Sequence, residues 1–388
     1  MVRSRRSVYQ SSTTQVTLLW RRGKNIQQRT VRNAGSARRT YRGDECRVES
    51  WSTTPYPGDQ SIDEMKSLIS TITEDSLITG LRWTRTHSRI HHEWEGETTH
   101  SDERTQDHLI LSLSRAQRVW NEPVYTKRLT PERWSQARAG MDDPLQALHF
   151  PLVNLSPGPI PVIFTHGAGA VMAHELIGHP TEAQAWAEKL SPFSQSLNST
   201  IAPPFLSVYD DPTRDHLVGS FSMDDEGYQA RRAPILRQGK LIHILGDYLH
   251  SHLFPCEPGN GRVANYSHFP TARMSNTVIG PGEDIVDPSR IMGAKRLQIL
   301  RLQGGSYSPD GMVTLAVRMG VVWEGSRPLG RVENTVLTGR LDHLLEGIMA
   351  VGADLHTCWS FGECTRGGQT LLVGAESPNL LLEGMVIL

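Results

Sequence analysis

The chain has 388 residues, of which 38% are hydrophobic and 21% are charged, an ordinary globular composition with room for about two domains. No apolar run approaches the roughly 20 residues that a membrane-spanning helix needs, and four scattered cysteines are too few for a disulfide framework. These counts exclude a small disulfide-rich secreted protein, and we expect a reduced, cytoplasmic compartment and no membrane contact.

The net charge of −1 hides an uneven distribution. Residues 1–50 hold twelve Lys and Arg against three Asp and Glu, a balance of +9, so residues 51–388 carry −10. A basic arm can bind nucleic acid, an anionic surface or an acidic partner, and it can equally be the solvated face of a sheet. Because no base-reading motif accompanies the arm, we favour the solvated sheet over nucleic-acid binding. No apolar segment follows Arg5 and Arg6, so a secretory signal is not expected.

The first elements in the chain predict an α+β domain. Alternating side chains over residues 15–31 predict two strands around a turn at 23–25. Ser61 and Glu64 form a capping box for a helix with one apolar face. Residues 108–113 read as a strand.

The stretch before that strand, residues 87–108, is polar and rich in histidine and acids. Its histidines could suggest a second metal, but the interleaved glutamates favour a solvated, charged loop. These histidines are His87, His91, His92 and His100.

Proline-dense residues 156–161 mark the predicted boundary between an N-terminal domain, 1–150, and a C-terminal domain, 151–388. A short strand over 162–164 and a glycine-rich turn lead into a helix over 170–178. Many short strands with Gly, Asp and Pro between them predict a largely antiparallel β domain that carries this helix. The predicted strands are 205–210, 218–224, 233–237, 240–248, 297–302, 313–322, 331–337 and 371–373.

The helix contains the sequence His174-Glu175-Leu-Ile-Gly-His179, which suggests zinc and a general base. In zinc peptidases the two histidines are usually four residues apart. Here they are five apart, which on a regular α-helix leaves the rings about 140° apart. Gly178 and Pro180 favour a change of direction at His179, and a wide π-type turn would act the same way. The sequence therefore provides a means to bring the two rings together.

Two histidines are an incomplete site, since a catalytic zinc usually has three protein ligands. The third could be an acid such as Glu182, another histidine or a cysteine thiolate. Without a metal, the alternative is a pair of helix-end histidines bonded to backbone carbonyls.

Residues 164–182, with a glycine-rich turn before His174-Glu175 and His179 and then Glu182, resemble the signature of the TldD/PmbA metallopeptidase family. The resemblance covers residues 150–388 well. Residues 1–150 fit loosely, as a shortened form of the family's α+β N-terminal domain. Further segments agree in the family's order: 222–227 with 236–241, then 259–277, and then 364–369 with 373–378.

The resemblance implies one Zn²⁺ per chain, held by His174, His179 and Cys364, with Glu175 activating the attacking water. Cys364 is preferred to Cys358 because Gly-Gly-Gln follows it as the family pattern requires. It also implies a peptidase for unfolded or small peptides, including leader removal from ribosomally made products. The chain resembles the catalytic member of the family, which predicts a homodimer or a heterodimer with a metal-free PmbA-like paralogue.

An anionic tetrahedral intermediate needs donors nearby, and the segment from 259 to 277 is rich in them. The alternative to a peptidase is a non-hydrolytic peptide-binding or assembly partner with a structural zinc, which four protein ligands would mark. The candidate substrate-binding residues are Arg262, Tyr266, His268 and Arg273.

Overall fold

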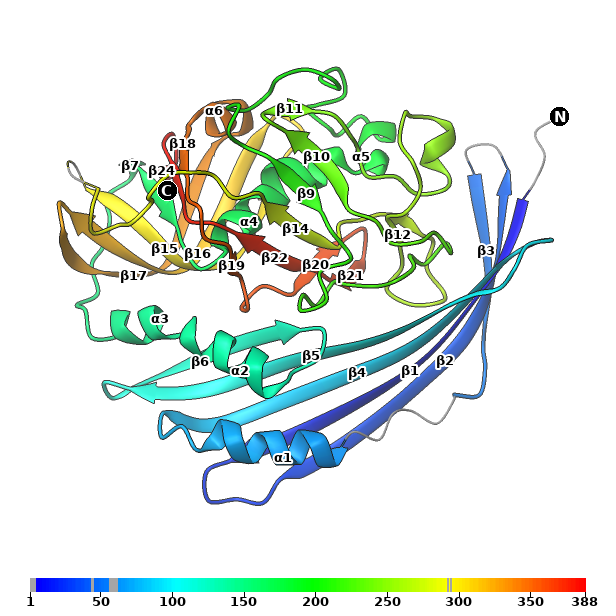
Figure 1. Ribbon diagram of the computed structural model, residues 1–388, viewed down its shortest axis with the longest axis horizontal. Helices are drawn as coiled ribbons and strands as arrows, with labels where there is room; N and C mark the ends of the chain where they lie inside the picture. The colour runs from blue at the N-terminus through cyan, green and yellow to red at the C-terminus, as the bar shows by residue number, and fades with distance from the viewer. Residues whose placement is uncertain (1–4, 43–44, 56–61, 292, 294) are drawn as a thin grey trace.

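The computed structural model describes residues 5–42, 45–55, 62–291, 293 and 295–388. As predicted, the chain is an α+β protein with mostly antiparallel sheets. A long curved sheet from the first part of the chain lies along one side of the molecule, and the elements that follow residue 130 pack above it (Figure 1). Among the described residues, no helix combines the length and the apolar character needed to span a membrane.

The long sheet has six antiparallel strands in the order β3-β2-β1-β4-β5-β6. The hairpin predicted over 15–31 is present, and its strands extend well beyond that range. Most basic side chains of residues 1–50 are exposed on β1 to β3, as expected for a solvated sheet surface, whereas Arg39 is fully buried. The strands are β1 (Arg5–Arg21), β2 (Gln27–Arg42), β3 (Glu45–Ser52), β4 (Ile78–Trp94), β5 (His100–Arg115) and β6 (Arg118–Thr126).

One face of this sheet packs on three helices, α1 (Ile62–Thr73), α2 (Pro131–Ala139) and α3 (Asp142–Ala147). The predicted apolar face of α1 is confirmed, while its predicted cap Ser61 lies outside the described residues. The same core includes side chains of β15 (Arg296–Tyr307) and β16 (Met312–Glu324) and so joins the two parts of the chain. Burying each large apolar side chain in this core stabilises the fold by about 1.5–3 kcal/mol relative to leaving it exposed.

The predicted charged loop over residues 87–108 is wrong, because β4 and β5 run through it. Both faces of these strands carry polar side chains, so the sequence lacks the apolar alternation that marks a strand. Buried ion pairs stabilise this polar interior, such as Arg85 Nε to Asp107 Oδ1 at 2.8 Å. His92 belongs to the interior as well and is 0% exposed.

The rest of the chain forms an eight-stranded sheet, β18-β23-β8-β15-β16-β17-β24-β7, and a six-stranded sheet, β11-β10-β9-β14-β22-β19. Helix α4 (Ala168–Ala173) lies between them, packing on β15 of the first and on β14 and β22 of the second. Strands of the first sheet are β7 (Gly158–Pro159), β8 (Val162–Phe164), β15 (Arg296–Tyr307), β16 (Met312–Glu324), β17 (Arg327–Arg340), β18 (Ile348–Val351), β23 (Leu380–Leu382) and β24 (Val386–Ile387). Those of the second are β9 (Val208–Asp210), β10 (Ala233–Arg237), β11 (Lys240–Leu241), β14 (Asn276–Ile279), β19 (His356–Thr357) and β22 (Gly374–Ser377).

Two short ribbons, two short α-helices and a 3₁₀ turn over His250–His252 also belong to this part. The ribbons are β12 (Gly261–Arg262) with β13 (Thr271–Ala272), and β20 (Glu363–Arg366) with β21 (Gln369–Leu372). The helices are α5 (Ala183–Ala187) and α6 (Leu341–Glu346).

The strand predicted over 218–224 is wrong, and that predicted over 240–248 is limited to β11. These segments belong to a region of turns whose backbone N–H groups bond to buried carboxylates. Asp224, for example, accepts from the backbone nitrogens of Glu226, Tyr228 and Gly261 at 2.9–3.0 Å. The carboxylates thus satisfy donors that a sheet ladder would otherwise satisfy.

Candidate metal centre

The helix that carries the histidines changes its winding where the sequence predicts it. Helix α4 continues as a π-helix over His174–Gly178 and then as a 3₁₀ turn over His179–Thr181. The backbone N–H of His179 donates to the carbonyl of His174, five residues back. This wide turn brings the two imidazole rings face to edge, with centroids 4.7 Å apart. The five-residue spacing is therefore compatible with a shared ion.

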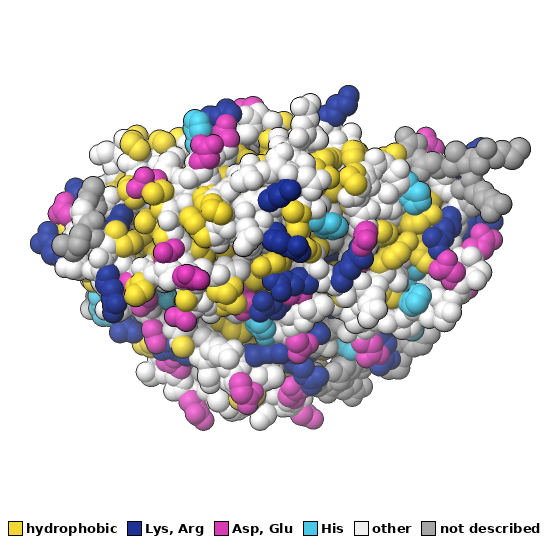
Figure 2. Space-filling model, turned by 45° about the horizontal axis from the view of Figure 1, so that its top comes forward, with side chains coloured by type: hydrophobic (Ala, Val, Ile, Leu, Met, Phe, Trp, Pro, Cys, Tyr) yellow, Lys and Arg dark blue, Asp and Glu magenta, His cyan; other side chains and the backbone are white. Residues whose placement is uncertain are grey.

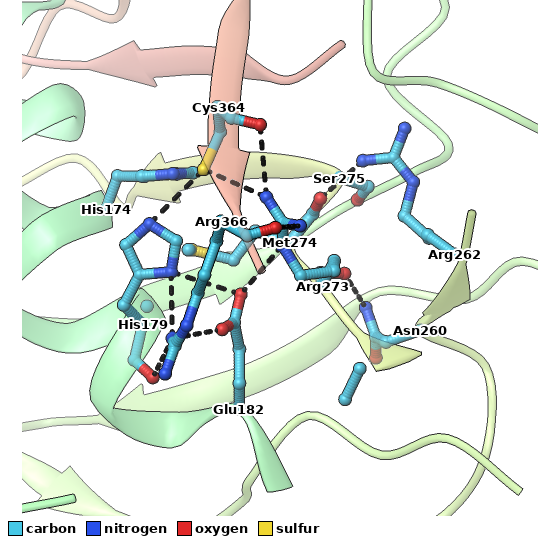
Figure 3. Close-up of polar contacts among 12 residues, drawn as sticks. His174, His179, Glu182, Asn260, Arg262, Arg273, Met274, Ser275, Cys364 and Arg366 are labelled. Carbon is cyan, nitrogen blue, oxygen red and sulfur yellow. Dashed lines mark hydrogen bonds and ion pairs between the residues drawn. The ribbon is translucent and has the colours of Figure 1, made fainter. Parts of the chain in front are cut away.

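Cys364 on β20 completes a group of three possible metal ligands. The ligand atoms of His174, His179 and Cys364 lie within 4.8 Å of one another, and no other such group occurs among the described residues. Cys364 Sγ lies 3.3 Å from His179 Nε2 (Figure 3). The other candidate ligands, Glu182 and Cys358, do not belong to this group.

The donor set fits a metal. His174 Nε2 is buried without a hydrogen-bond partner, while its Nδ1 lies 3.1 Å from Thr277 Oγ1. An unsatisfied buried nitrogen is costly, and a metal ion on Nε2 would remove that cost. Two imidazole nitrogens and a thiolate are ligands that zinc accepts readily, and three protein ligands are typical of a catalytic site.

Burial sets the charges in the centre. Burial, together with the neighbouring His179, holds the pKa of His174 well below its ordinary value. Its ring is therefore neutral, with a nitrogen lone pair available to a metal ion. Burial works to lower the pKa of His179 as well, but Glu182 and Cys364 beside it raise that pKa to about 10. A bound cation would oppose this protonation, because metal ligands bind in their deprotonated forms.

Glu175 lies beside the ligands. Its Oε2 is 4.0 Å from His179 Nε2, and its side chain lines a cavity of about 220 Å³ with Leu190, Gly305 and Tyr307. Burial raises the pKa of Glu175, and a hydrogen bond from the backbone of Gly305 partly offsets this rise. An acid whose pKa is raised toward neutrality is suited to proton transfer.

The four candidate substrate residues are in different places. Arg273 is buried behind the ligands, with Nη2 3.2 Å from Cys364 Sγ. Arg262 bonds to the backbone carbonyls of Met274 and Leu372. Tyr266 lies over Gly35 of β2, with its hydroxyl 3.2 Å from Ser52 Oγ, and His268 is in the same loop. The structure thus brings only Arg273 to the ligand group.

Sequence reasoning missed Arg366 and Tyr307. Arg366 donates to Glu182 and to the carbonyl of His179, and its Nη2 lies 3.4 Å from the hydroxyl of Tyr307. Arg366 follows Cys364 by two residues on one strand, so both side chains lie on the same face, and this spacing could have indicated it. Tyr307 lies at the end of β15, and no local signal links it to the site.

A buried His-His-Cys group with an adjacent glutamate on a widened helix defines the chain as a candidate metallopeptidase. A family model described as the PmbA/TldA metallopeptidase C-terminal domain matches residues 157–388. The chain therefore belongs to the TldD/PmbA family.

Known relatives agree with this assignment. A TldD metalloprotease homologue of Buchnera aphidicola is 27% identical over 249 residues, covering 62% of this chain and 52% of that protein. A zinc metalloprotease TldD homologue of Saccharolobus solfataricus is 28% identical over 233 residues, covering 59% and 52%. The chain spans about half the length of these relatives.

Solved structures share the fold at low sequence identity. TldE from Thermococcus kodakarensis superposes with a TM-score of 0.73 at 13% identity, covering 99% of this chain and 96% of that one. A putative modulator of DNA gyrase from Thermotoga maritima gives 0.73 at 15% identity, with the same coverage.

Proposed function

We propose that the chain is a zinc-dependent peptidase that cleaves unfolded or small peptides, including the removal of a leader from a ribosomally made product. The observation that carries the proposal is the placement of Glu175 beside His174, His179 and Cys364 in one buried centre. The name of the Saccharolobus relative, a zinc metalloprotease, supports the choice of metal. Zinc, when bound, would polarise a peptide carbonyl and lower the pKa of water.

Glu175 acts as the general base and acid in this proposal. It takes a proton from the water whose oxygen attacks the carbonyl carbon, and the raised pKa of this buried carboxylate favours that transfer. When the C–N bond breaks, Glu175 delivers the proton to the leaving amine. The products are a free carboxylate and a free amine.

The size of the site supports a short or unfolded substrate. The cavity at Glu175 measures about 220 Å³, below the roughly 300–1,000 Å³ of pockets for drug-sized ligands. A side chain or a short extended segment fits such a space, and a folded surface does not. Arg262 and Tyr266, which remain proposed substrate contacts, line a second cavity of about 370 Å³ against β1, β4 and β5 of the long curved sheet.

The test is Glu175→Gln, which keeps the size of the side chain and removes its base. We expect wild-type protein to hold about one zinc per chain and to cleave candidate peptides, as followed by mass spectrometry. The variant should retain the zinc and lose about 10²- to 10⁴-fold in rate. Metal-free wild-type protein, or a variant as active as wild type, would refute the proposal.

The alternative, a peptide-binding partner with a structural zinc, predicts four protein ligands. Only three side chains form the ligand group in the part of the chain that the structure describes, which favours the peptidase. X-ray absorption of the zinc-loaded protein separates the two, because a fourth protein ligand would identify a structural site.

We further propose that the chain works in the reduced cytoplasm, which keeps the thiol of Cys364 free, as a homodimer or paired with a metal-free paralogue. Nucleic acid is not a proposed partner, because no base-reading motif accompanies the basic residues 1–50. In Figure 2 several Lys and Arg side chains gather at the centre of one face, with Asp and Glu mostly around them. Light scattering of the purified chain, alone and with a paralogue, distinguishes the assemblies, and a monomer under both conditions contradicts this proposal.

A further inference from the structure

We infer that Glu182 and Arg273 are positioning residues for two of the three metal ligands, Glu182 for His179 and Arg273 for Cys364. This inference rests on the proposed zinc site. Neither residue belongs to the ligand group, and both side chains are almost fully buried, 1% and 3% exposed.

Glu182 controls where His179 carries its proton. The chain leaves the 3₁₀ turn in an extended conformation at Glu182, which directs the carboxylate back to the ring, with Oε1 3.2 Å from Nδ1. Nε2 of the same ring faces Cys364 Sγ. A metal on Nε2 requires the ring proton on Nδ1, and Glu182 is positioned to accept that proton's hydrogen bond.

Arg366 competes for the same nitrogen. Its Nη1 lies 3.3 Å from His179 Nδ1, where it can donate only if the ring proton is on Nε2, the metal side. Nη1 has two other acceptors, a carboxylate oxygen of Glu182 and the carbonyl of His179. Arg366 therefore keeps its partners when the proton moves to Nδ1, so metal binding does not leave it unpaired.

Arg273 contacts both Cys364 and Glu182, the residue that supports His179 (Figure 3). Its Nε is 3.6 Å from Glu182 Oε1, and its Nη2 is 3.2 Å from Cys364 Sγ and 3.1 Å from the carbonyl of Cys364. A buried carboxylate and a buried thiolate both need a cation close by, and one guanidinium serves both. Loss of Arg273 would therefore loosen two ligands together.

The test measures zinc affinity rather than catalysis. The near-isosteric variant Glu182→Gln and the variant Arg273→Met are compared with wild type by competition with a chelator of known affinity. We expect each to bind zinc about 10- to 100-fold more weakly, the range found when partners behind metal ligands are removed. The matched control is Glu188→Gln, an exposed acid six residues further along the chain, which should bind zinc as wild type does.

Two measurements separate positioning from a purely structural role. Thermal unfolding of the metal-free proteins measures the stability of the fold. The thiolate-to-metal absorption of cobalt-loaded protein shows whether Cys364 still binds the metal. The inference predicts reduced zinc affinity in both variants and a changed cobalt spectrum in Arg273→Met. Unchanged zinc affinity in Glu182→Gln would overturn it, even if that variant melts earlier. Wild-type protein without zinc affinity would instead refute the proposed function.

Discussion

Gly178 determines how closely the helix that carries His174 and His179 can approach Met274. A Cβ atom at this position would lie 1.8 Å from Met274 Sδ. Met274 Sδ in turn accepts from Thr277 Oγ1 at 3.6 Å, and that hydroxyl is the partner of His174 Nδ1. The absence of a side chain at Gly178 thus bears on the orientation of His174, a proposed metal ligand, through Met274 and Thr277.

Gly178→Ala should therefore destabilise the protein by about 1–3 kcal/mol, the usual cost of overpacking. Adding Met274→Ala to this variant should restore part of the loss, because it makes room for the new methyl group. Urea unfolding measures both effects. Gly80→Ala is the control, since its Cβ would have only ordinary contacts, 3.5 Å or longer. Equal stability of Gly178→Ala and Gly80→Ala would contradict this account.

At the scale of elements, strand β4 carries a polar interior that has consequences for pH. His92 on this strand is buried, and neither of its ring nitrogens has a hydrogen-bond partner. Burial, with the nearby charge of Arg39, lowers the pKa of His92 to about 3. The unfolded chain, where histidine titrates near pH 6.5, therefore binds more protons between these two values.

This histidine should make the fold less stable as the pH falls below about 6.5, with the loss complete near pH 3. Between pH 7 and pH 5, His92 alone should lower the free energy of unfolding by about 2 kcal/mol. His92→Leu should remove that share from the pH dependence measured by urea unfolding. His91→Leu, on the opposite face of β4, retains His92 and serves as the control. A wild-type pH dependence in His92→Leu would show that the ring is protonated in the folded protein.

On the scale of the whole molecule, the candidate metal centre joins distant parts of the chain. Two of its proposed ligands come from the helix between the sheets, and the third comes from a ribbon 185 residues after His179. A ligand that binds only the folded chain stabilises it by about 2.7 kcal/mol at a free concentration about 100 times its Kd. Zinc should therefore stabilise the entire fold.

Removing zinc with a chelator should lower the melting midpoint by several degrees, and added zinc should restore it. Differential scanning calorimetry gives both values without a peptide substrate. Cys364→Ser should abolish the zinc-dependent shift, whereas Cys358→Ser, at a buried cysteine outside the ligand group, should keep it. The same midpoint with and without zinc would argue against a site that joins the two segments.

The sequence predicted those features that local spacing controls. The five-residue separation of the histidines predicted either a change of direction at Gly178 and Pro180 or a π-type turn, and the structure has the π turn. The apolar spacing predicted α1. The predicted strand over 108–113 is part of β5, whereas the rest of β5 and the second half of β4 were missed because polar side chains cover both faces there. The third ligand could not be selected from spacing, since Cys364 approaches the histidines only through tertiary packing, and Arg366 and Tyr307 were missed for the same reason.

The position of Cys364, 185 residues after His179, has a consequence for synthesis. A ribosome that has made residues 1–300 has already produced both histidines and Glu175, but the strand that carries the thiol has not yet been made. Until that strand emerges and pairs with β21, the nascent chain holds two of the three proposed ligands. The order of residues along the chain thus delays assembly of the His-His-Cys group until residue 364 has been made.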